Sequence, residues 1–187
     1  MLDKLLSLDV QLFVYLNGLG SEAYDEFWLF ITKQFNWIPF FLLLLYIIYK
    51  KIGGKQTLYV LLFVAVLILI TDQFTNLVKY SFQRLRPCNN PDIHSVMRIV
   101  KSSKSFSFFS GHAANSMAAA MFIYQLIKPY FKYTFLLFLW PLVFAYSRIY
   151  LGLHYPLDIF SGYVFGMLSG FFVFKIYQFT QIKHFPL

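Results

Sequence analysis

Long apolar stretches alternate with short charged segments along the whole chain. A helix needs about 20 residues to cross about 30 Å of hydrocarbon, and lysine side chains at its ends can extend to the lipid headgroups. Five stretches contain no Asp, Glu, Lys or Arg, and each is bounded by such residues: Gln34–Tyr49, Gln56–Thr71, Ser105–Ile127, Tyr133–Ser147 and Ile159–Phe174. Five such stretches in succession predict an all-α fold, a polytopic transmembrane helical bundle of about five spans.

The segment before the first stretch has the pattern of an amphipathic helix. Its apolar residues recur at helical spacing: Leu5, Leu8, Leu12, Phe13 and Leu16. Such a helix is expected to lie on the membrane surface rather than to cross it. Asp3 and Asp9 interrupt the pattern of a signal peptide, so we expect no cleavage. The sequence contains no linker or internal repeat, and residues 1–187 are expected to form one domain.

Composition supports a membrane protein. Hydrophobic residues make up 59% of the chain and charged residues only 13%, with a mean hydropathy of +0.60. These values exclude a disordered chain and disfavour an ordinary soluble enzyme, whose surface needs more charged residues. The net charge of +8 fits a nucleic-acid partner or a membrane protein with a basic cytoplasmic face. The single cysteine, Cys88, is expected to be a free thiol in a loop or in the interior.

The charges divide unequally between the two ends of the predicted bundle. One end, formed by the links after the first and third stretches and by the tail, has seven cations and no acidic residue: Lys50, Lys51, Lys55, Lys128, Lys132, Lys175 and Lys183. The other end has nine cations and all eight acidic residues. Positively charged links favour the cytoplasm. We therefore expect a multi-pass protein of a bacterial cytoplasmic membrane, with a lipid partner and no nucleic acid.

Groups capable of chemistry gather at the second, outer end. Antiparallel helices bring four clusters to one level of the bilayer: Lys79 with Arg84 and Arg86-Pro87, then Ser110-Gly111-His112, then Ser147-Arg148, and finally His154 with Asp158. Ionisable groups at this depth are costly unless they are functional or solvated. The sequence therefore predicts one polar site.

Two of these clusters suggest specific chemistry. If a helix begins at Ser110-Gly111, its free backbone N–H groups can bind an anion. His154 and Asp158 are four residues apart, so a carboxylate can orient the imidazole and leave its other nitrogen free as a base or nucleophile. Two histidines and an aspartate also resemble a metal site. Lys79, Arg86 and Arg148 would repel a dication and favour a phosphate, so we expect no metal and no cofactor.

Other polar residues have simpler interpretations. Thr75 and Asn76 are expected to form hydrogen bonds between helices, and Asp72 to orient or partly neutralise Lys79. Four cations are expected in a solvated loop or at anionic lipid headgroups: Arg84, Arg98, Lys101 and Lys104. The remaining histidines are assigned to a loop and to the tail: His94 and His184.

The spacing of the clusters resembles that of a known family. Lys79-x6-Arg86-Pro87, Ser110-Gly111-His112 and Ser147-Arg148-x5-His154-x3-Asp158 are similar to the three-part signature of the type 2 phosphatidic acid phosphatase (PAP2) superfamily. Bacterial acid phosphatases and vanadium haloperoxidases share that signature. The family usually has proline before Ser-Gly-His, where this chain has Phe109. A proline there would mainly stiffen the loop.

The resemblance implies roles for these residues. His154 would attack phosphorus to form a phosphohistidine, Asp158 would orient its ring, and His112 would protonate the leaving oxygen. The phosphoryl oxygens would be held by five residues: Lys79, Arg86, Ser110, Gly111 and Arg148. The implied activity is metal-independent hydrolysis of a lipid phosphate or diphosphate ester.

The substrate implied by the resemblance is a membrane lipid. Undecaprenyl diphosphate ranks first, followed by lipid A and phosphatidylglycerophosphate. A lipid-phosphate binding or transport protein without hydrolysis is an alternative of another class. A third is a structural membrane partner, because Gly162, Gly166 and Gly170 form a stripe suited to close helix contact within the bundle or in a dimer. The oligomeric state stays open.

Overall fold

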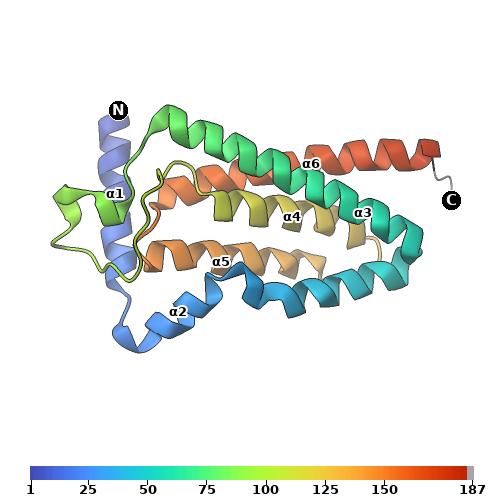
Figure 1. Ribbon diagram of the computed structural model, residues 1–187, viewed down its shortest axis with the longest axis horizontal. Coiled ribbons are helices and arrows are strands. Elements are labelled where there is room, and N and C mark those ends of the chain that lie inside the picture. Colours follow the sequence, from blue (N-terminus) through green and yellow to red (C-terminus); the bar gives the residue numbers. More distant parts are fainter. Residues whose placement is uncertain (185–187) are drawn as a thin grey trace.

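The computed structural model describes residues 1–184, with side chains as far as residue 181. Every regular element in this part of the chain is helical (Figure 1). The α-helices are α1 Leu2–Gly18, α2 Asp25–Ile31, α3 Ile38–Phe82, α4 Gly111–Ile127, α5 Leu139–Tyr150 and α6 Pro156–His184. Short 3₁₀ helices are η1 Glu22–Tyr24, η2 Gln34–Trp37, η3 Pro87–Asn89, η4 Pro91–Ile93 and η5 Thr134–Phe138. The all-α prediction is confirmed.

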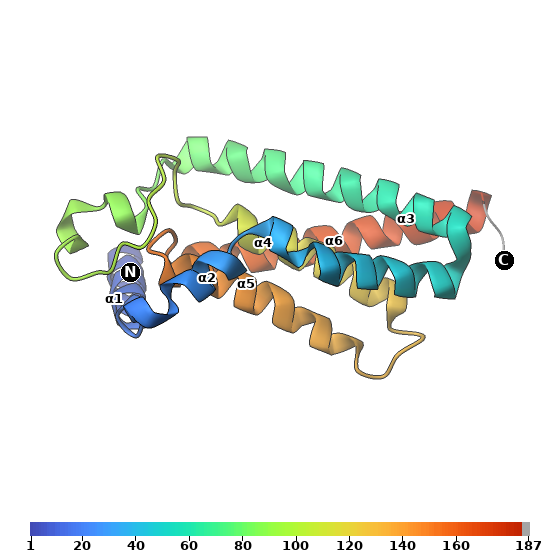
Figure 2. The same cartoon turned by 60° about the horizontal axis from the view of Figure 1, so that its bottom comes forward.

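Helix α3 is a helical hairpin with two arms (Figure 2). Gly53 has φ 78° and ψ 169°, a backbone conformation that only glycine adopts without strain, and the chain reverses there. The two arms contain the first two predicted stretches. The second arm continues past Thr71 to Phe82, because the polar residues that follow Thr71 remain helical and carry the chain into the site.

The two arms of α3 run alongside α4, α5 and α6 with alternating directions (Figures 1 and 2). Helix α4 lies in the middle, and its small residues Ala113, Ala114, Ala118 and Ala120 are buried. Helix α4 occupies residues Gly111–Ile127 of the third stretch, and residues 105–110 form a loop before it. The preceding loop is bonded elsewhere: backbone N–H groups of residues 107 and 110 donate to carbonyls of residues 84 and 158.

The glycine stripe of α6 packs within the bundle. A Cβ atom at Gly166 would lie 2.3 Å from the carbonyl oxygen of Ala114, and one at Gly170 would lie 2.4 Å from that of Ala118. Gly162 makes a similar approach to the backbone of Ser110. The stripe therefore lets α6 touch the backbone of α4, as small residues do in membrane helix pairs.

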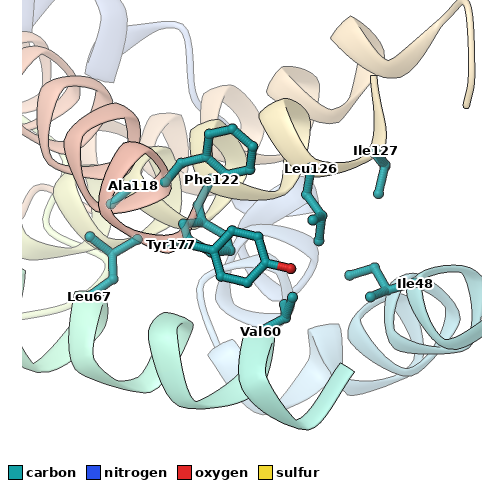
Figure 3. Packing of buried hydrophobic residues seen from close by; sticks show 9 residues of the cluster. Ile48, Val60, Leu67, Ala118, Phe122, Leu126, Ile127 and Tyr177 are labelled. Carbon is teal, nitrogen blue, oxygen red and sulfur yellow. The ribbon is translucent and has the colours of Figure 1, made fainter. Parts of the chain in front are cut away.

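The end of the bundle away from the site contains an apolar core (Figure 3). Tyr177 of α6 is 1% exposed and packs among Val60 and Leu67 of α3 and Phe122 of α4. Ile48 from the first arm of α3 belongs to the same cluster. This core joins both arms of the hairpin to α4 and α6.

The outer surface of the bundle is apolar. Large side chains such as Leu42, Leu58, Leu69 and Phe172 are more than half exposed. Within the described part of the chain, two helical segments are long and apolar enough to cross a membrane, Gln34–Ile93 and Pro156–Gln181, and the first contains both arms of α3. Exposed apolar surface of this extent is typical of a helical bundle that faces lipid.

Helix α1 lies across one end of the bundle, roughly perpendicular to the long helices (Figure 1). The predicted helix is confirmed; leucines that are expected to lie on the membrane are exposed, and another face packs on the protein. Phe13 packs on the protein together with the polar residues Asp9 and Asn17, whereas Leu5 and Leu12 are exposed. Asp9 and Asn17 are buried because each has hydrogen-bond partners in the bundle.

Candidate active site

The predicted site residues come from the ends of α3, α4, α5 and α6 and from the segments that connect them. Lys79 lies in the last turn of α3, Arg148 in the last turn of α5, His154 in the turn between α5 and α6, and Asp158 in the first turn of α6. A cavity of about 370 Å³ opens here. Five predicted residues line it: Lys79, Arg86, Gly111, His112 and Arg148. The other three, Ser110, His154 and Asp158, are buried behind its wall.

The N-terminus of α4 forms one wall of the cavity. Ser110 is its N-cap, and the Ser110 hydroxyl accepts a hydrogen bond from the backbone N–H of Ala113 at 3.4 Å. The next residue, Gly111, lines the cavity, so the free N–H groups of a 17-residue helix begin at this surface. The His112 ring stacks on Phe144 with centroids 5.2 Å apart. The predicted helix start is confirmed, and it supplies an anion-binding wall.

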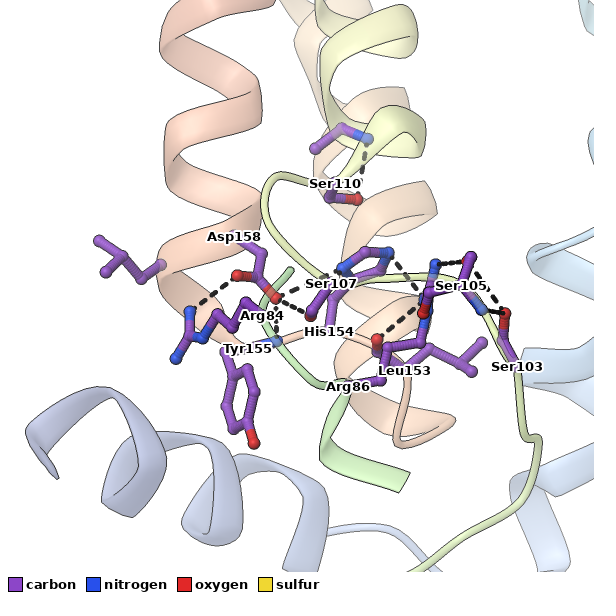
Figure 4. A network of polar contacts seen from close by, with 12 residues as sticks. Arg84, Arg86, Ser103, Ser105, Ser107, Ser110, Leu153, His154, Tyr155 and Asp158 are labelled. Atoms are coloured by element: carbon purple, nitrogen blue, oxygen red, sulfur yellow. Dashed lines mark hydrogen bonds and ion pairs between the residues drawn. The ribbon is translucent and has the colours of Figure 1, made fainter. Parts of the chain in front are cut away.

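Arg86 is held in a fixed orientation between two loops (Figure 4). Its Nε and Nη2 atoms each donate at 2.8 Å to Ser105, to the carbonyl oxygen and the hydroxyl respectively. Its Nη1 atom donates to the carbonyl oxygen of Leu153 at 2.9 Å. Nη1 is also 3.0 Å from Nε2 of His154. A guanidinium has no acceptor, so Nε2 of His154 is the unprotonated nitrogen and Nδ1 carries the proton.

The His154 ring is therefore arranged as a neutral base. Its Nδ1 is 3.4 Å from Oδ2 of Asp158 and 3.4 Å from the hydroxyl of Ser107. Burial lowers the pKa of His154 well below its usual value, and the positive charges of Arg86 and Arg148 lower it further. The unprotonated Nε2 faces Nη1 of Arg86, a residue that lines the cavity.

Arg148 presents an unused donor at the site. Its Nη1 atom donates to the Thr32 hydroxyl at 2.5 Å, which ties α5 to the end of α2. Its Nε atom is buried and has no hydrogen-bond partner among the described residues. A buried charged donor without a partner is costly, and an anion in the cavity would remove that cost.

Several interpretations of the polar residues on α3 change. Thr75 and Asn76 do not bond between helices: Thr75 donates to the Thr71 carbonyl oxygen at 2.7 Å, and Asn76 donates to Asp72 at 3.2 Å. The reason is that both partners lie one turn earlier on the same helix. The bond between helices comes from Thr71, which donates to Asn115 at 2.7 Å. Asp72 lines the same cavity as Lys79.

Two cations assigned to a solvated loop form ion pairs instead. Arg84 bridges Asp9 and Asp158, and Arg98 pairs with Asp25 at 2.9 Å. Their partners come from distant parts of the chain, so spacing within the loop gave no indication of them. The spacing of Asp9, Phe13 and Asn17 along one face of α1 was the available signal.

The structure also places other residues that the sequence assigned to loops, to the interior or to the tail. Lys101, Lys104 and His94 are exposed, as expected for loop residues, and Cys88 is a buried free thiol. The side chain of His184 lies outside the described residues.

A second, apolar cavity of about 480 Å³ adjoins the polar one. It lies between the two arms of α3, α4 and α5, and includes Phe41, Leu44, Ile68 and Ala119 in its lining. Three residues line both cavities: Gln34, Asn115 and Phe144. The cationic site therefore borders a space suited to a hydrocarbon chain.

Comparison with known proteins identifies the family in which this site occurs. The sequence model of the PAP2 superfamily matches residues 56–182, about two thirds of the chain and all three signature segments. The chain belongs to the PAP2 superfamily. Membership, together with relatives that are lipid A 4'-phosphatases, identifies it as a phosphatase, a hydrolase of phosphate esters.

The relatives of this chain are named as enzymes that act on lipids. The chain is 34% identical over 181 residues to the lipid A 4'-phosphatase of Bacteroides thetaiotaomicron, covering 94% of this chain and 80% of that protein. It is 29% identical to the lipid A 4'-phosphatase of Porphyromonas gingivalis, over 97% and 78% respectively. Identity to the undecaprenyl-diphosphatase of Sulfolobus acidocaldarius is 27%, over 95% and 82%.

A solved PAP2 structure shares the fold. The phosphatidylglycerolphosphate phosphatase of Bacillus subtilis superimposes with a TM-score of 0.73 and 19% identity, covering 98% of this chain and 90% of that chain. In this PAP2 protein, Phe109 takes the place of the family's usual proline. Its ring is buried and packs against Phe165 and Phe74, with centroids 5.2 and 6.5 Å away.

Proposed function

We propose that this PAP2 protein removes a phosphate group from a lipid A-type lipid at the outer surface of a bacterial cytoplasmic membrane. The observation that carries the proposal is the cationic cavity joined to an apolar one through Gln34, Asn115 and Phe144. A phosphate fits the first and an acyl chain the second. At similar coverage, the chain is 34% and 29% identical to the two lipid A 4'-phosphatases and 27% identical to the undecaprenyl-diphosphatase, which supports lipid A over undecaprenyl diphosphate.

In the proposed reaction, a phosphoryl oxygen accepts a hydrogen bond from Nη1 of Arg86, which in the structure points at Nε2 of His154. Nε2 of His154 then attacks phosphorus, and the bond from phosphorus to the lipid oxygen breaks. His112, protonated in the complex with the phosphate dianion, gives its proton to that leaving oxygen and becomes neutral. The product is a phosphohistidine and a dephosphorylated lipid.

The second half of the reaction frees the enzyme. His112, now neutral, takes a proton from water, and the resulting hydroxide attacks phosphorus. The bond from phosphorus to Nε2 breaks and inorganic phosphate leaves. Lys79, Arg86, Arg148 and the N–H groups at Gly111 hold the phosphoryl oxygens in both steps, so no metal ion is required.

The proposed roles of His154 and His112 depend on where each ring lies and on which ring nitrogen carries a proton. Nδ1–H of His154 faces the Asp158 carboxylate, which stabilises positive charge on the ring as Nε2 attacks. His112 lines the cavity and is within reach of a leaving group bound there.

A lipid panel tests the substrate. The purified protein in detergent with EDTA is expected to release phosphate fastest from lipid A, more slowly from undecaprenyl diphosphate, and most slowly from phosphatidylglycerophosphate. The measurement is inorganic phosphate released per minute, with His94→Gln as a matched histidine control because His94 is exposed. Fastest release from undecaprenyl diphosphate would reverse the ranking, and loss of activity in EDTA would contradict the metal-free reaction. Binding of these lipids without release would identify a binding or transport protein instead.

We further propose that five helical arms cross the membrane: the two arms of α3, then α4, α5 with η5, and α6. The basic links lie together at the end opposite the site, where Lys51 Nζ is 5.8 Å from the ring centroid of Tyr130. Lysines at this end favour the cytoplasm, so the site would face outward.

A reporter fusion tests this orientation. Periplasmic alkaline phosphatase fused after Lys183 is expected to be inactive, because it needs export to fold. A fusion after Val100, in the site-end loop that follows both arms of α3, is the matched control and is expected to be active. The reverse pattern of reporter activity would invert the proposed topology.

A further inference from the structure

A chain of alternating charges connects the N-terminal helix to the candidate site. Arg84 Nη2 donates to Asp9 Oδ2 at 2.6 Å, and Arg84 Nη1 donates to Asp158 Oδ1 at 2.7 Å. The side chains of Asp9, Arg84 and Asp158 are 4%, 18% and 0% exposed. Such buried, directly bonded pairs are far stronger than ion pairs on an open surface.

Arg84 bonds to one oxygen of the Asp158 carboxylate, and the other oxygen faces His154. Oδ2 of Asp158 accepts from the Ser107 hydroxyl, accepts from the backbone N–H of Tyr155 at 2.9 Å, and lies 3.4 Å from His154 Nδ1. Figure 4 shows Asp158 between Arg84 on one side and Ser107 and His154 on the other. A fully buried carboxylate needs a paired charge to stay ionised, and Arg84 is the cation bonded to it.

Asp9 in turn fixes Arg84 and the start of α6. Its Oδ1 atom accepts the backbone N–H of Leu157 at 2.7 Å, one residue before Asp158. The Arg84 guanidinium also lies over the Tyr155 ring, 4.0 Å from the centroid. Asp9 therefore bonds both to the cation that pairs with Asp158 and to the backbone beside it.

Helix α1 is anchored well enough to hold Asp9 in place. Asn17 donates to the carbonyl oxygens of Ile149 and Tyr150 at 3.1 and 3.0 Å. Phe13 packs edge-to-face on Tyr155 with centroids 5.3 Å apart. Asp9, Phe13 and Asn17 form one face of α1, and that face lies on the segment that carries His154.

We propose that Asp9 and Arg84 are positioning residues for the hydrolytic reaction, holding Asp158 ionised and oriented so that it can hold Nδ1–H of His154. This inference rests on the function proposed above. Neither residue touches the phosphate in the proposal. Asp9 lies outside the PAP2 signature segments quoted above, and Arg84 occupies one of the unspecified positions between Lys79 and Arg86.

The matched comparison is the Arg98–Asp25 ion pair. It also joins the N-terminal part of the chain to the 83–110 loop, but it lies beside Tyr150 rather than beside His154 or Asp158. Loss of this pair would remove a structural tie of the same kind without changing the surroundings of the carboxylate. A purely structural role for Arg84 predicts the same effects for Arg84→Gln and Arg98→Gln.

The experiment measures kcat, KM, inhibition by inorganic phosphate and thermal unfolding for Arg84→Gln, Asp9→Asn, the double variant and Arg98→Gln. Arg84→Gln is expected to lower kcat roughly 10- to 100-fold, as loss of an outer hydrogen-bond partner does at other sites. KM and inhibition by phosphate are expected to stay unchanged, because Lys79, Arg86 and Arg148 are intact. The double variant should be no slower than Arg84→Gln, since both changes break one network.

Arg84→Lys keeps the positive charge and is expected to recover part of the lost kcat. Equal kcat in Arg84→Gln and the unmodified protein would overturn the inference, as would a loss of kcat matched by Arg98→Gln. Weakened phosphate inhibition in parallel with kcat would also overturn it, since that reports a disordered site. His154→Gln distinguishes failure of the proposed function from failure of the positioning role. Activity in His154→Gln would overturn the proposed function. An inactive His154→Gln together with a fully active Arg84→Gln would overturn only the positioning role.

Discussion

His154→Gln is expected to lower the rate of phosphate release on the order of 10,000-fold, because it removes the nitrogen that attacks phosphorus in the proposed reaction. Glutamine is close to histidine in size and can still accept a hydrogen bond from Arg86. The side chain is 1% exposed, so an alanine would leave a cavity that glutamine avoids. The measurement is kcat for the best lipid of the panel, in detergent, with thermal unfolding as a check on folding.

The matched variant for this prediction is His94→Gln, which changes the same residue type in an exposed position of the 83–110 loop. It is expected to keep the full rate. A second readout is covalent: brief incubation with lipid carrying ³²P should label the unmodified protein through an acid-labile bond, and His154→Gln should take up no label. Labelling of the variant would show that another residue is the nucleophile.

Gly166→Ala is expected to destabilise the folded bundle by about 1–3 kcal/mol, the usual cost of overpacking a tight interior. The new Cβ atom would lie 2.3 Å from the Ala114 carbonyl oxygen, and backbone atoms cannot move aside as a flexible side chain can. Helices α4 and α6 would have to separate. Since α4 carries His112 and α6 carries Asp158, kcat should fall about 100-fold for a displacement near 1 Å.

Gly54→Ala is the control for this change. A Cβ atom there would find its nearest neighbour, the Tyr49 ring, at 3.5 Å, which is ordinary contact. Alanine favours a helix over glycine by up to about 1 kcal/mol, so this variant should be as stable as the unmodified protein or more stable. The midpoint of thermal unfolding and the rate of phosphate release are measured for both variants. A Gly166→Ala protein with unchanged midpoint and rate would contradict the close contact between α4 and α6.

The candidate site was largely predictable because its signals are local. His154 and Asp158 are four residues apart, and Ser110 precedes a helix whose start it caps. Short links between antiparallel helices then bring these segments to one end of the bundle. The catalytic assignments themselves remain predictions for the variants above to test.

The contacts around the site were not predictable, and Asp9 and Arg84 show why. They are 75 residues apart, and nothing in the loop sequence indicates a partner for Arg84 on α1. The leucines of α1 are expected to lie on the membrane, but their pattern does not indicate that Asp9 and Asn17 are buried against the bundle. Likewise Thr75 bonds within its own helix, although its pattern also fitted a bond to a neighbour.

By itself the sequence determined the helical class, the apolar stretches and the candidate site residues. Each depends on hydrophobicity or on spacing over a few residues, and these are properties of the local chain. Only the tertiary structure decided which face of each helix is buried and which charges pair. In a bundle surrounded by lipid, apolar side chains are as stable outside as inside, so hydrophobicity does not identify the interior. Buried polar groups must be paired, and their partners are known only once the helices are packed.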